Sequence, residues 1–236
     1  MKMTSNELRG FVTGLVLGDG TIDKGTERRA FRIATINEEF AYYIKEAFND
    51  NTKFKITLMQ YSATNKGGVK HQEYCRVSTN AQPYFAKIYH QFYDDYRNRR
   101  ITKKALEWLT DAGLANWYMS DGYIVNVGKT KGKIKDRRVE IALDRYCETD
   151  VDKVITYFET TYGYKCSKVK RKSGMYRIRI SLKDAQYFFL RIAPYVLKVV
   201  GMEYKLNMNY DYQPKWMCDE YYELMMSINS ASRLTE

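Results

Sequence analysis

Histidine, cysteine and proline are scarce in this 236-residue chain, and each scarcity argues against a class of protein. The two histidines, His71 and His90, are too few for a histidine-based metal nuclease or a Ser-His-Asp site, so any hydrolysis would depend on carboxylates and lysines. The four cysteines are dispersed without a C-x-x-C pair, which argues against a zinc knuckle or disulfide framework and predicts an intracellular, reducing compartment. Three prolines leave little room for a proline-rich linker.

Long apolar runs and a secretion signal are also missing. A membrane-spanning helix needs about 20 apolar residues, and the best candidate, residues 188–202, is interrupted by Arg191 and Lys198. The N-terminal residues MKMTSNELRG contain no hydrophobic signal core. We therefore expect no membrane partner.

Positive charge and aromatic side chains are abundant instead. The chain carries 39 Lys and Arg against 28 Asp and Glu, a formal net charge of +11, with a sequence pI of about 9.3. An apolar share of 44% and 22 tyrosines suffice for the packed core of one large domain or two half-size ones. A basic balance of this size predicts a polyanionic partner, nucleic acid before an anionic membrane.

The chain contains one internal repeat. Residues 76–85 align with residues 179–188, and residues 15–20 align with residues 117–122 at nearly the same spacing. Two independent matches at one spacing are hard to obtain by chance, so the chain is predicted to contain two copies of one unit.

These copies would be residues 1–101 and 102–236, related by pseudo-twofold symmetry. Periodicities recur in the same order in both, which predicts an α+β fold of two αββαββα-like half-domains with antiparallel sheets. Each half opens on an apolar helix, at residues 5–18 and 111–120. The other predicted elements are strands 29–36, 53–61, 73–79, 139–143, 166–170 and 176–182, and helices 38–48, 81–93, 151–162 and 184–199.

Several predicted strands carry Lys or Arg on one face. In residues 176–182, for example, Arg177 and Arg179 alternate with isoleucines. Such side chains can merely solubilise a sheet, but their recurrence in at least four strands favours a basic saddle formed by both sheets, and a β-ribbon fits the DNA major groove. The residues predicted to bind DNA are Arg28, Arg29, Arg32, Lys53, Lys55, Lys70, Arg76, Ser78, Arg138, Lys168, Lys170, Lys172, Arg177, Arg179 and Ser181.

Each half also places an Asp-Gly pair, Asp19-Gly20 and Asp121-Gly122, at the C-terminal end of its first helix. A helix C-terminus carries about half a negative charge, so an aspartate there is disfavoured. One such pair is an ordinary helix stop, whereas two at symmetric positions favour a bound divalent cation. Carboxylates and helix-terminal carbonyls are hard oxygen ligands that suit Mg²⁺.

The first helices have small residues where they would meet. Gly10, Gly14 and Gly18 fall on one helical stripe, and their second-half counterparts are small except Asn116. The two helices are therefore predicted to pack in parallel at the interface between the halves. Parallel packing brings both Asp-Gly ends together at the middle of the basic surface.

The segments VTGLVLGDG (residues 12–20) and LANWYMSDG (residues 114–122) resemble the two LAGLIDADG motifs of single-chain homing endonucleases. The resemblance covers residues 5–210, and two such motifs in one basic chain are much more specific than one. It implies a monomeric site-specific endonuclease that recognises a long double-stranded DNA site. Such enzymes hydrolyse both strands across the minor groove and leave 3′ overhangs.

The resemblance also implies the metal ligands. Asp19 and Asp121 correspond to the acids that share two or three Mg²⁺ ions, for which Mn²⁺ is a substitute. The backbone carbonyls of Gly18 and Ser120 would be additional ligands.

A basic residue near each acid is a further expectation from the resemblance. Lys205 is the second-half candidate, and Arg100 is the first-half candidate with Lys103 as its rival. Arginine cannot deprotonate in a protein, so Arg100 could stabilise charge but not act as a base. Metal-bound water is the more economical nucleophile.

Two alternative functions remain within the same fold. Some LAGLIDADG proteins are maturases that bind their host intron RNA, and others bind DNA without cutting it. Both aspartates favour the endonuclease, because each is costly without its metal. An intein is not expected, because the chain starts at Met and has no room for splicing segments. The sequence leaves open whether the gene is intron-encoded or free-standing, and whether its host is bacterial, phage or organellar.

Overall fold

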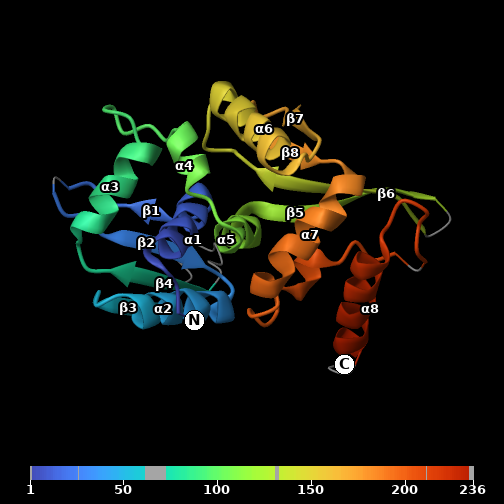
Figure 1. The fold of residues 1–236 in the computed structure, drawn as a ribbon, viewed down its shortest axis with the longest axis horizontal. Helices are drawn as coiled ribbons and strands as arrows, with labels where there is room; N and C mark the ends of the chain where they lie inside the picture. Colours follow the sequence, from blue (N-terminus) through green and yellow to red (C-terminus); the bar gives the residue numbers. More distant parts are fainter. Residues whose placement is uncertain (1, 26, 62–72, 131–132, 211, 234–236) are drawn as a thin grey trace, which may run out of the picture.

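The computed structural model describes residues 2–25, 27–61, 73–130, 133–210 and 212–233. Figure 1 shows two β-sheets on either side of a central pair of helices, α1 and α5. None of the helices in these ranges is long and apolar enough to span a membrane.

The elements follow the order predicted for both halves. The first half contains α1 (Ser5–Leu17), β1 (Thr21–Ile22), β2 (Phe31–Thr35), α2 (Glu38–Asn51), β3 (Ile56–Tyr61), β4 (Tyr74–Thr79) and α3 (Pro83–Phe92). After α4 (Lys103–Glu107), the second contains α5 (Asp111–Asp121), β5 (Gly122–Thr130), β6 (Lys133–Ala142), α6 (Glu148–Tyr162), β7 (Cys166–Lys170), β8 (Tyr176–Ile180), α7 (Leu182–Val196), the 3₁₀ helix η1 (Glu203–Leu206) and α8 (Asp219–Arg233). The αββαββα order is confirmed, while a boundary after residue 101 stays a prediction.

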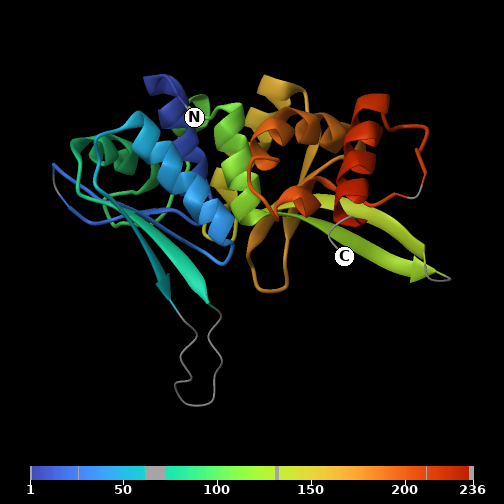
Figure 2. The same ribbon diagram turned by 90° about the horizontal axis from the view of Figure 1, so that it is seen from below.

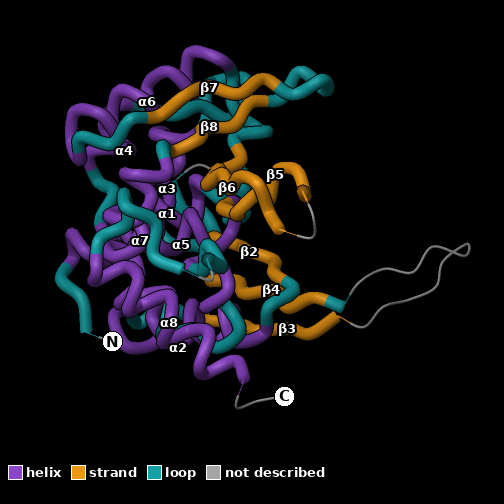
Figure 3. The backbone as a smooth tube through the Cα atoms, turned by 90° about the vertical axis from the view of Figure 1, so that its right-hand side faces the viewer, coloured by secondary structure: helices purple, strands orange, loops and turns teal. Residues whose placement is uncertain are grey.

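The described strands form two antiparallel four-stranded sheets of identical topology. Their strand orders are β1-β2-β4-β3 and β5-β6-β8-β7. Helices lie on one side of the molecule and strands on the other (Figures 2 and 3). Buried residues such as Ile33, Val77, Ile141 and Ile178 face the helices. The opposite face of each sheet is called the outer face below.

The main departure from the predicted elements is at the start of the second sheet. The predicted strand 139–143 is only the end of the ten-residue β6, which pairs with β5. The strand β5 was not predicted because its glycines and lysine interrupt the apolar–polar alternation that marks a strand. It begins at Gly122, directly where α5 ends.

The helices α1 and α5 pack with their backbones in contact, as the small-residue stripe predicts. A Cβ atom added at Gly14 would lie 1.9 Å from the carbonyl oxygen of Gly113, and one at Gly113 would lie 2.2 Å from that of Gly10. Asn116 is fully buried in this interface, and its Nδ2 donates to the carbonyl of Phe11 at 3.1 Å. That hydrogen bond explains why a polar residue occupies the stripe.

Gly14→Ala is therefore expected to destabilise the fold. The added methyl has to push two helix backbones apart, and overpacking of this kind costs about 1–3 kcal/mol. Thermal unfolding should show a lower Tm than wild type, whereas Ser5→Ala, in the exposed first turn of α1, should leave Tm within about one degree. An unchanged Tm for Gly14→Ala would contradict the close packing.

Candidate active site

The packing of α1 on α5 brings the two motif aspartates to one end of the interface. Asp19 follows α1 and Asp121 is the last residue of α5. A Cβ atom added at Gly18 would lie 3.7 Å from Oδ2 of Asp121, so the two helix ends approach closely. Asp19 is 41% exposed and forms an ion pair with Arg145 at 3.5 Å. The two carboxylates thus share one site but differ in environment.

Asp121 is the more perturbed acid. Burial, followed by repulsion from the Asp19 carboxylate, raises the pKa of Asp121 to about 7. The nearby cations Arg145, Lys205 and Arg99 oppose this shift without cancelling it. No ion pair within 4.0 Å neutralises Asp121 in the described part of the chain. A further positive charge next to both carboxylates would relieve the repulsion between Asp19 and Asp121.

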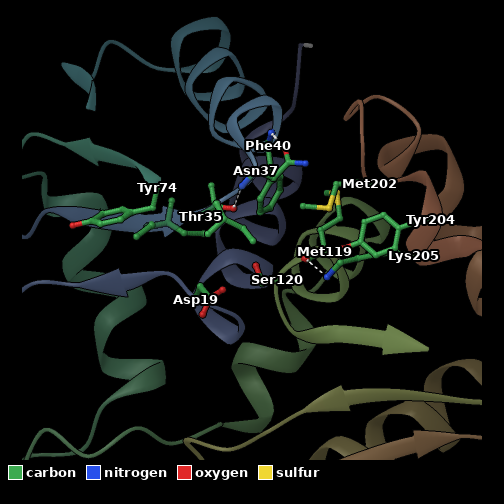
Figure 4. Close-up of a pocket in the computed structure, with 13 residues that line it drawn as sticks. Asp19, Thr35, Asn37, Phe40, Tyr74, Met119, Ser120, Met202, Tyr204 and Lys205 are labelled. Carbon is green, nitrogen blue, oxygen red and sulfur yellow. Dashed lines mark hydrogen bonds between the residues drawn. The ribbon is translucent and has the colours of Figure 1, made fainter. Parts of the chain in front are cut away.

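Lys205 caps the C-terminus of α5 from the 3₁₀ helix η1. Its buried ammonium donates to the carbonyl of Met119 at 2.5 Å (Figure 4) and to that of Gly122 at 3.0 Å. Burial lowers the pKa of Lys205 to about 8, although both aspartates pull it upward. The side chain is therefore a fixed cation below pH 8, held against the helix end that carries Asp121.

Arg99 has the equivalent position at the end of α1. Its Nη1 donates to the carbonyls of Val16 at 3.0 Å and Gly18 at 3.3 Å, and its Nη2 donates to that of Gly20 at 2.5 Å. In the repeat alignment, Val16 and Gly20 correspond to residues whose carbonyls Lys205 contacts. Arg99 is thus the structural counterpart of Lys205.

The structure places the predicted first-half candidates elsewhere. Arg100 is exposed and donates to the carbonyl of His90 at 2.8 Å, while Lys103 is exposed at the start of α4. The prediction was wrong by one position. Successive side chains of an extended segment point to opposite sides, so Arg99 contacts the end of α1 and Arg100 does not. Arg99 lies in such a segment, in an isolated bridge with Tyr93.

The second half also reaches across to α1. Tyr146, buried in the loop between β6 and α6, donates its hydroxyl to the carbonyl of Leu17 at 3.1 Å. The adjacent Arg145 pairs with Asp19. Sequence reasoning missed both residues, because neither belongs to the repeat nor to an alternating basic strand.

A cavity of about 540 Å³ opens beside Asp19 (Figure 4). On one side it is lined by Thr35 at the end of β2 and Asn37 at the start of α2, and on the other by η1. Ser120 and Lys205 also line it. A cavity bordered by a carboxylate and a fixed cation has room and charge for part of a sugar–phosphate backbone.

The first sheet places several predicted DNA contacts on its outer face. Arg32 pairs in register with Ser78 across β2 and β4, and Arg76 lies two pairs farther along, on the same face. Arg32 forms an ion pair with Asp23 at 2.7 Å. Three predicted residues are exposed in neighbouring loops: Arg28, Lys53 and Lys55.

The second sheet does the same with Arg138, Arg177 and Arg179. Val139 and Ile180, their neighbours in β6 and β8, are buried on the helix side. Lys172 is exposed in the turn after β7. The outer faces of both sheets therefore carry arginines, as the predicted basic saddle requires.

Two predicted DNA contacts are instead structural. Arg29 is only 8% exposed, and its guanidinium lies 3.5 Å from the ring centroid of Tyr89. Ser181 falls beyond β8 and is the N-cap of α7, where its hydroxyl accepts from the backbone of Asp184. Both were misassigned because strand alternation was extended past the real strand ends. Lys70 lies outside the described residues.

Lys168 and Lys170 lie on the wrong face for the predicted role. Strand β7 pairs Lys168 with the buried Ile178, which puts the lysine on the helix side of the sheet. There its ammonium pairs with Glu148 at 2.7 Å and Asp152 at 2.8 Å, both on α6. The alternation was predicted correctly, but a strand's face depends on register, which a one-residue shift reverses.

Comparison with known proteins decides the family. A sequence model of the LAGLIDADG DNA endonuclease family matches residues 9–188, which include both motif segments (residues 12–20 and 114–122) and both sheets. The chain belongs to the LAGLIDADG DNA endonuclease family. The resemblance found in the two motifs is thereby confirmed.

Individual LAGLIDADG proteins are similar to this chain over most of their length. "Probable intron-encoded endonuclease 1" of Wickerhamomyces canadensis is 25% identical over 198 residues, which cover 83% of this chain and 82% of that protein. The homing endonuclease I-WcaI, solved with its DNA recognition sequence, matches with a TM-score of 0.73 and 22% identity over 87% and 88% of the two chains. The N-terminal LAGLIDADG domain of DUF199/WhiA matches with a TM-score of 0.53 and 12% identity over 94% and 88%. The structural matches support the LAGLIDADG fold.

The placement of Arg99 against the first LAGLIDADG helix predicts unequal effects of neighbouring substitutions. Arg99→Ala removes three hydrogen bonds to backbone carbonyls at the end of α1. It should slow DNA cleavage by about 10–100-fold, the loss expected if the end of α1 holds a metal ligand. Arg100→Ala is the matched control and should leave the rate within about twofold. Single-turnover cleavage at saturating Mg²⁺ measures both; equal rates would contradict the assignment.

Proposed function

We propose that this protein is a site-specific DNA endonuclease in which Asp19 and Asp121 hold Mg²⁺ ions used to hydrolyse both strands. The observation that carries the proposal is the meeting of two carboxylates at adjoining C-termini of α1 and α5. A helix C-terminus repels an aspartate, so this pair is unfavourable without a compensating cation.

The residues present fit such a cation. Asp121 is largely buried, its pKa is raised by burial and by Asp19, and a divalent ion would stabilise its charged form. Among the described residues there is no cluster of three or more His, Cys, Asp or Glu side chains for a metal. The carbonyls of Gly18 and Ser120, water and DNA phosphates would therefore complete the coordination of Mg²⁺, an ion that typically keeps few protein ligands.

The other site residues hold these ligands and balance charge. Lys205 and Arg99 fix the ends of α5 and α1, and thereby set the positions of the two aspartates. Their positive charges offset part of the negative charge of a phosphate in the site. A bound divalent ion would stabilise charge on the scissile phosphate and lower the pKa of water, which supplies the nucleophile.

Double-stranded DNA is the proposed partner, bound as a monomer. The outer faces of the two sheets offer arginines on each side of the aspartates, and the two halves together supply both acids. I-WcaI is described with its DNA recognition sequence, and the Wickerhamomyces canadensis relative is named intron-encoded, which supports this partner and an intron origin. Each half would cut one strand across the minor groove, leaving 3′ overhangs.

An intracellular, reducing compartment is part of the proposal. All four cysteines are free thiols. Burial raises the pKa of Cys166 to about 12, so that thiol stays protonated and unreactive.

A cleavage assay tests the proposal. The substrate is a plasmid that carries the sequences flanking the gene, joined without it, and the protein is incubated with Mg²⁺, with Mn²⁺ or with EDTA. Linear product with 3′ overhangs is expected with either metal and not with EDTA. Cutting in EDTA would refute the metal proposal, and nicking of one strand alone would refute the two-acid site.

A further inference from the structure

A buried acid lies in the middle of the basic outer face of the second sheet. Glu140 is only 4% exposed, and it belongs to β6, one of the two inner strands. Its register partners are Tyr123 on β5 and Arg179 on β8. An acid that faces a polyanion weakens non-specific binding, so its presence there needs a reason.

Both oxygens of Glu140 are fully used by its neighbours. Oε1 accepts from Nε and Nη2 of Arg179 at 3.0 and 2.8 Å. Oε2 accepts from Nη1 of Arg177 at 3.3 Å and from the hydroxyl of Tyr123 at 3.0 Å. Burial opposes ionisation, but these hydrogen bonds hold the pKa of Glu140 below its ordinary value. The carboxylate is therefore a permanent anchor for two arginines.

The fold itself does not require this acid. In the first sheet, Ala34 pairs in register with Arg76, the repeat counterpart of Arg179. Arg76 is held there by Tyr61 and Tyr74, whose hydroxyls accept from its guanidinium at 3.2 and 3.4 Å. Both halves thus fix an arginine on the outer face, by different means.

The anchored arginines keep donors for a ligand. No hydrogen bond within the described part of the chain uses Nη1 of Arg179 or Nη2 of Arg177. Their side chains are 30% and 20% exposed, respectively. Arg179 therefore keeps both N–H groups of Nη1 and the second N–H of Nη2, and Arg177 keeps those of Nη2. Terminal guanidinium nitrogens match O6 and N7 of guanine in the major groove. A fixed orientation favours a base edge over a phosphate that any flexible cation can reach.

We propose that Glu140 is a specificity-determining positioning residue, which fixes Arg177 and Arg179 to read guanine-containing base pairs in the second-half flank of the DNA site. The inference rests on the proposed recognition of double-stranded DNA. Glu140 acts through the arginines and need not touch DNA itself.

Selection of binding sites from a randomised double-stranded DNA library tests this role. Binding is measured in EDTA, so that no cleavage interferes. For Glu140→Gln, discrimination against substituted base pairs in one flank should fall about tenfold, the loss of one bidentate contact. Affinity for non-specific DNA should rise, and its salt dependence should steepen by about 0.9 in log K per log salt for each phosphate that a released arginine neutralises.

Glu148→Gln is the matched control. It removes the same charge from a carboxylate that pairs with Lys168 on the helix side of the same sheet. It should leave base preferences in both flanks unchanged. A loss of discrimination equal to that of Glu140→Gln would overturn the positioning role, because net charge alone would then explain it.

Tyr123→Phe separates geometry from charge, and it decides the question if Glu140→Gln does not fold. It removes one hydrogen bond to Glu140 without changing net charge. We expect a smaller loss of discrimination at the same base pairs and an unchanged salt dependence. Unaltered base preferences in folded Glu140→Gln, or in Tyr123→Phe if the former is unfolded, would overturn the inference. A wild-type protein that selects no consensus would instead refute the proposed function.

Discussion

Replacement of either motif aspartate by asparagine is expected to abolish double-strand cleavage and to preserve DNA binding. Asparagine keeps the size of the side chain but removes the charge that would hold the proposed divalent cation between α1 and α5. Loss of a direct ligand should cost more than the loss of a residue behind it, so the rate should fall by well over about 100-fold. The arginines of the outer faces are untouched, so binding in EDTA should be that of wild type.

A supercoiled plasmid assay with denaturing gels measures each strand separately. Asp111→Asn is the matched control, since it makes the same change at the opposite end of α5, where Asp111 pairs with Arg191. The two motif variants need not be equal: Asp19 is paired with Arg145, whereas Asp121 is only partly exposed and has a raised pKa, so one variant can retain slow nicking. Wild-type cutting of both strands by either variant would refute the shared metal site.

The metal-free protein should become more stable when Asp121 is replaced by Asn. The pKa of Asp121 rises from 3.8 to about 7 on folding, so the folded state binds a proton more tightly than the unfolded state. Ionisation of Asp121 therefore costs stability, progressively between about pH 4 and pH 7 and fully above that range. A shift of about three pKa units corresponds to roughly 4 kcal/mol, of which we expect about 2–4 kcal/mol to appear in Asp121→Asn at pH 8.

Urea unfolding in EDTA at several pH values measures this effect. The advantage of Asp121→Asn should shrink towards zero near pH 4, where the wild-type carboxyl is protonated. Added Mg²⁺ should stabilise wild type by mass action and leave the variant unchanged. Asp19→Asn removes only the repulsion that Asp19 exerts on Asp121 and should therefore give a smaller advantage over the same pH range. A pH-independent advantage, or destabilisation at pH 8, would contradict the raised pKa of Asp121.

The repeat and the motifs were sufficient to predict the centre of this molecule. The features used were local in sequence: the small residues of α1, the apolar helices and the paired Asp-Gly ends. Such patterns can be recognised without knowing which distant residues will be in contact. Arg99 was missed in favour of Arg100 because an extended segment alternates its side chains, and only its anchoring at Tyr93 decides which residue faces α1. Tyr146 was missed because its contact with Leu17 joins residues far apart in the chain.

The DNA-binding surface was predicted less completely for a related reason. A lysine or arginine is visible in sequence, but its partner is not. Lys168 is neutralised by acids of α6, and Arg29 is covered by Tyr89. Net charge therefore overstates the number of cations available to phosphates, and the register of each strand decides which ones remain.

The contacts of Arg145 and Tyr146 with α1 limit how LAGLIDADG halves can be exchanged. The end of the first motif helix is completed by a loop of the second half, whereas Lys205, which caps α5, comes from the same half as α5. A hybrid nuclease that joins this first half to a foreign second half loses those contacts unless the graft retains the loop. The reverse hybrid keeps the Lys205 cap on its own motif helix. In either hybrid the mismatch therefore falls at the end of the first motif helix, and the cap of the second motif helix is kept.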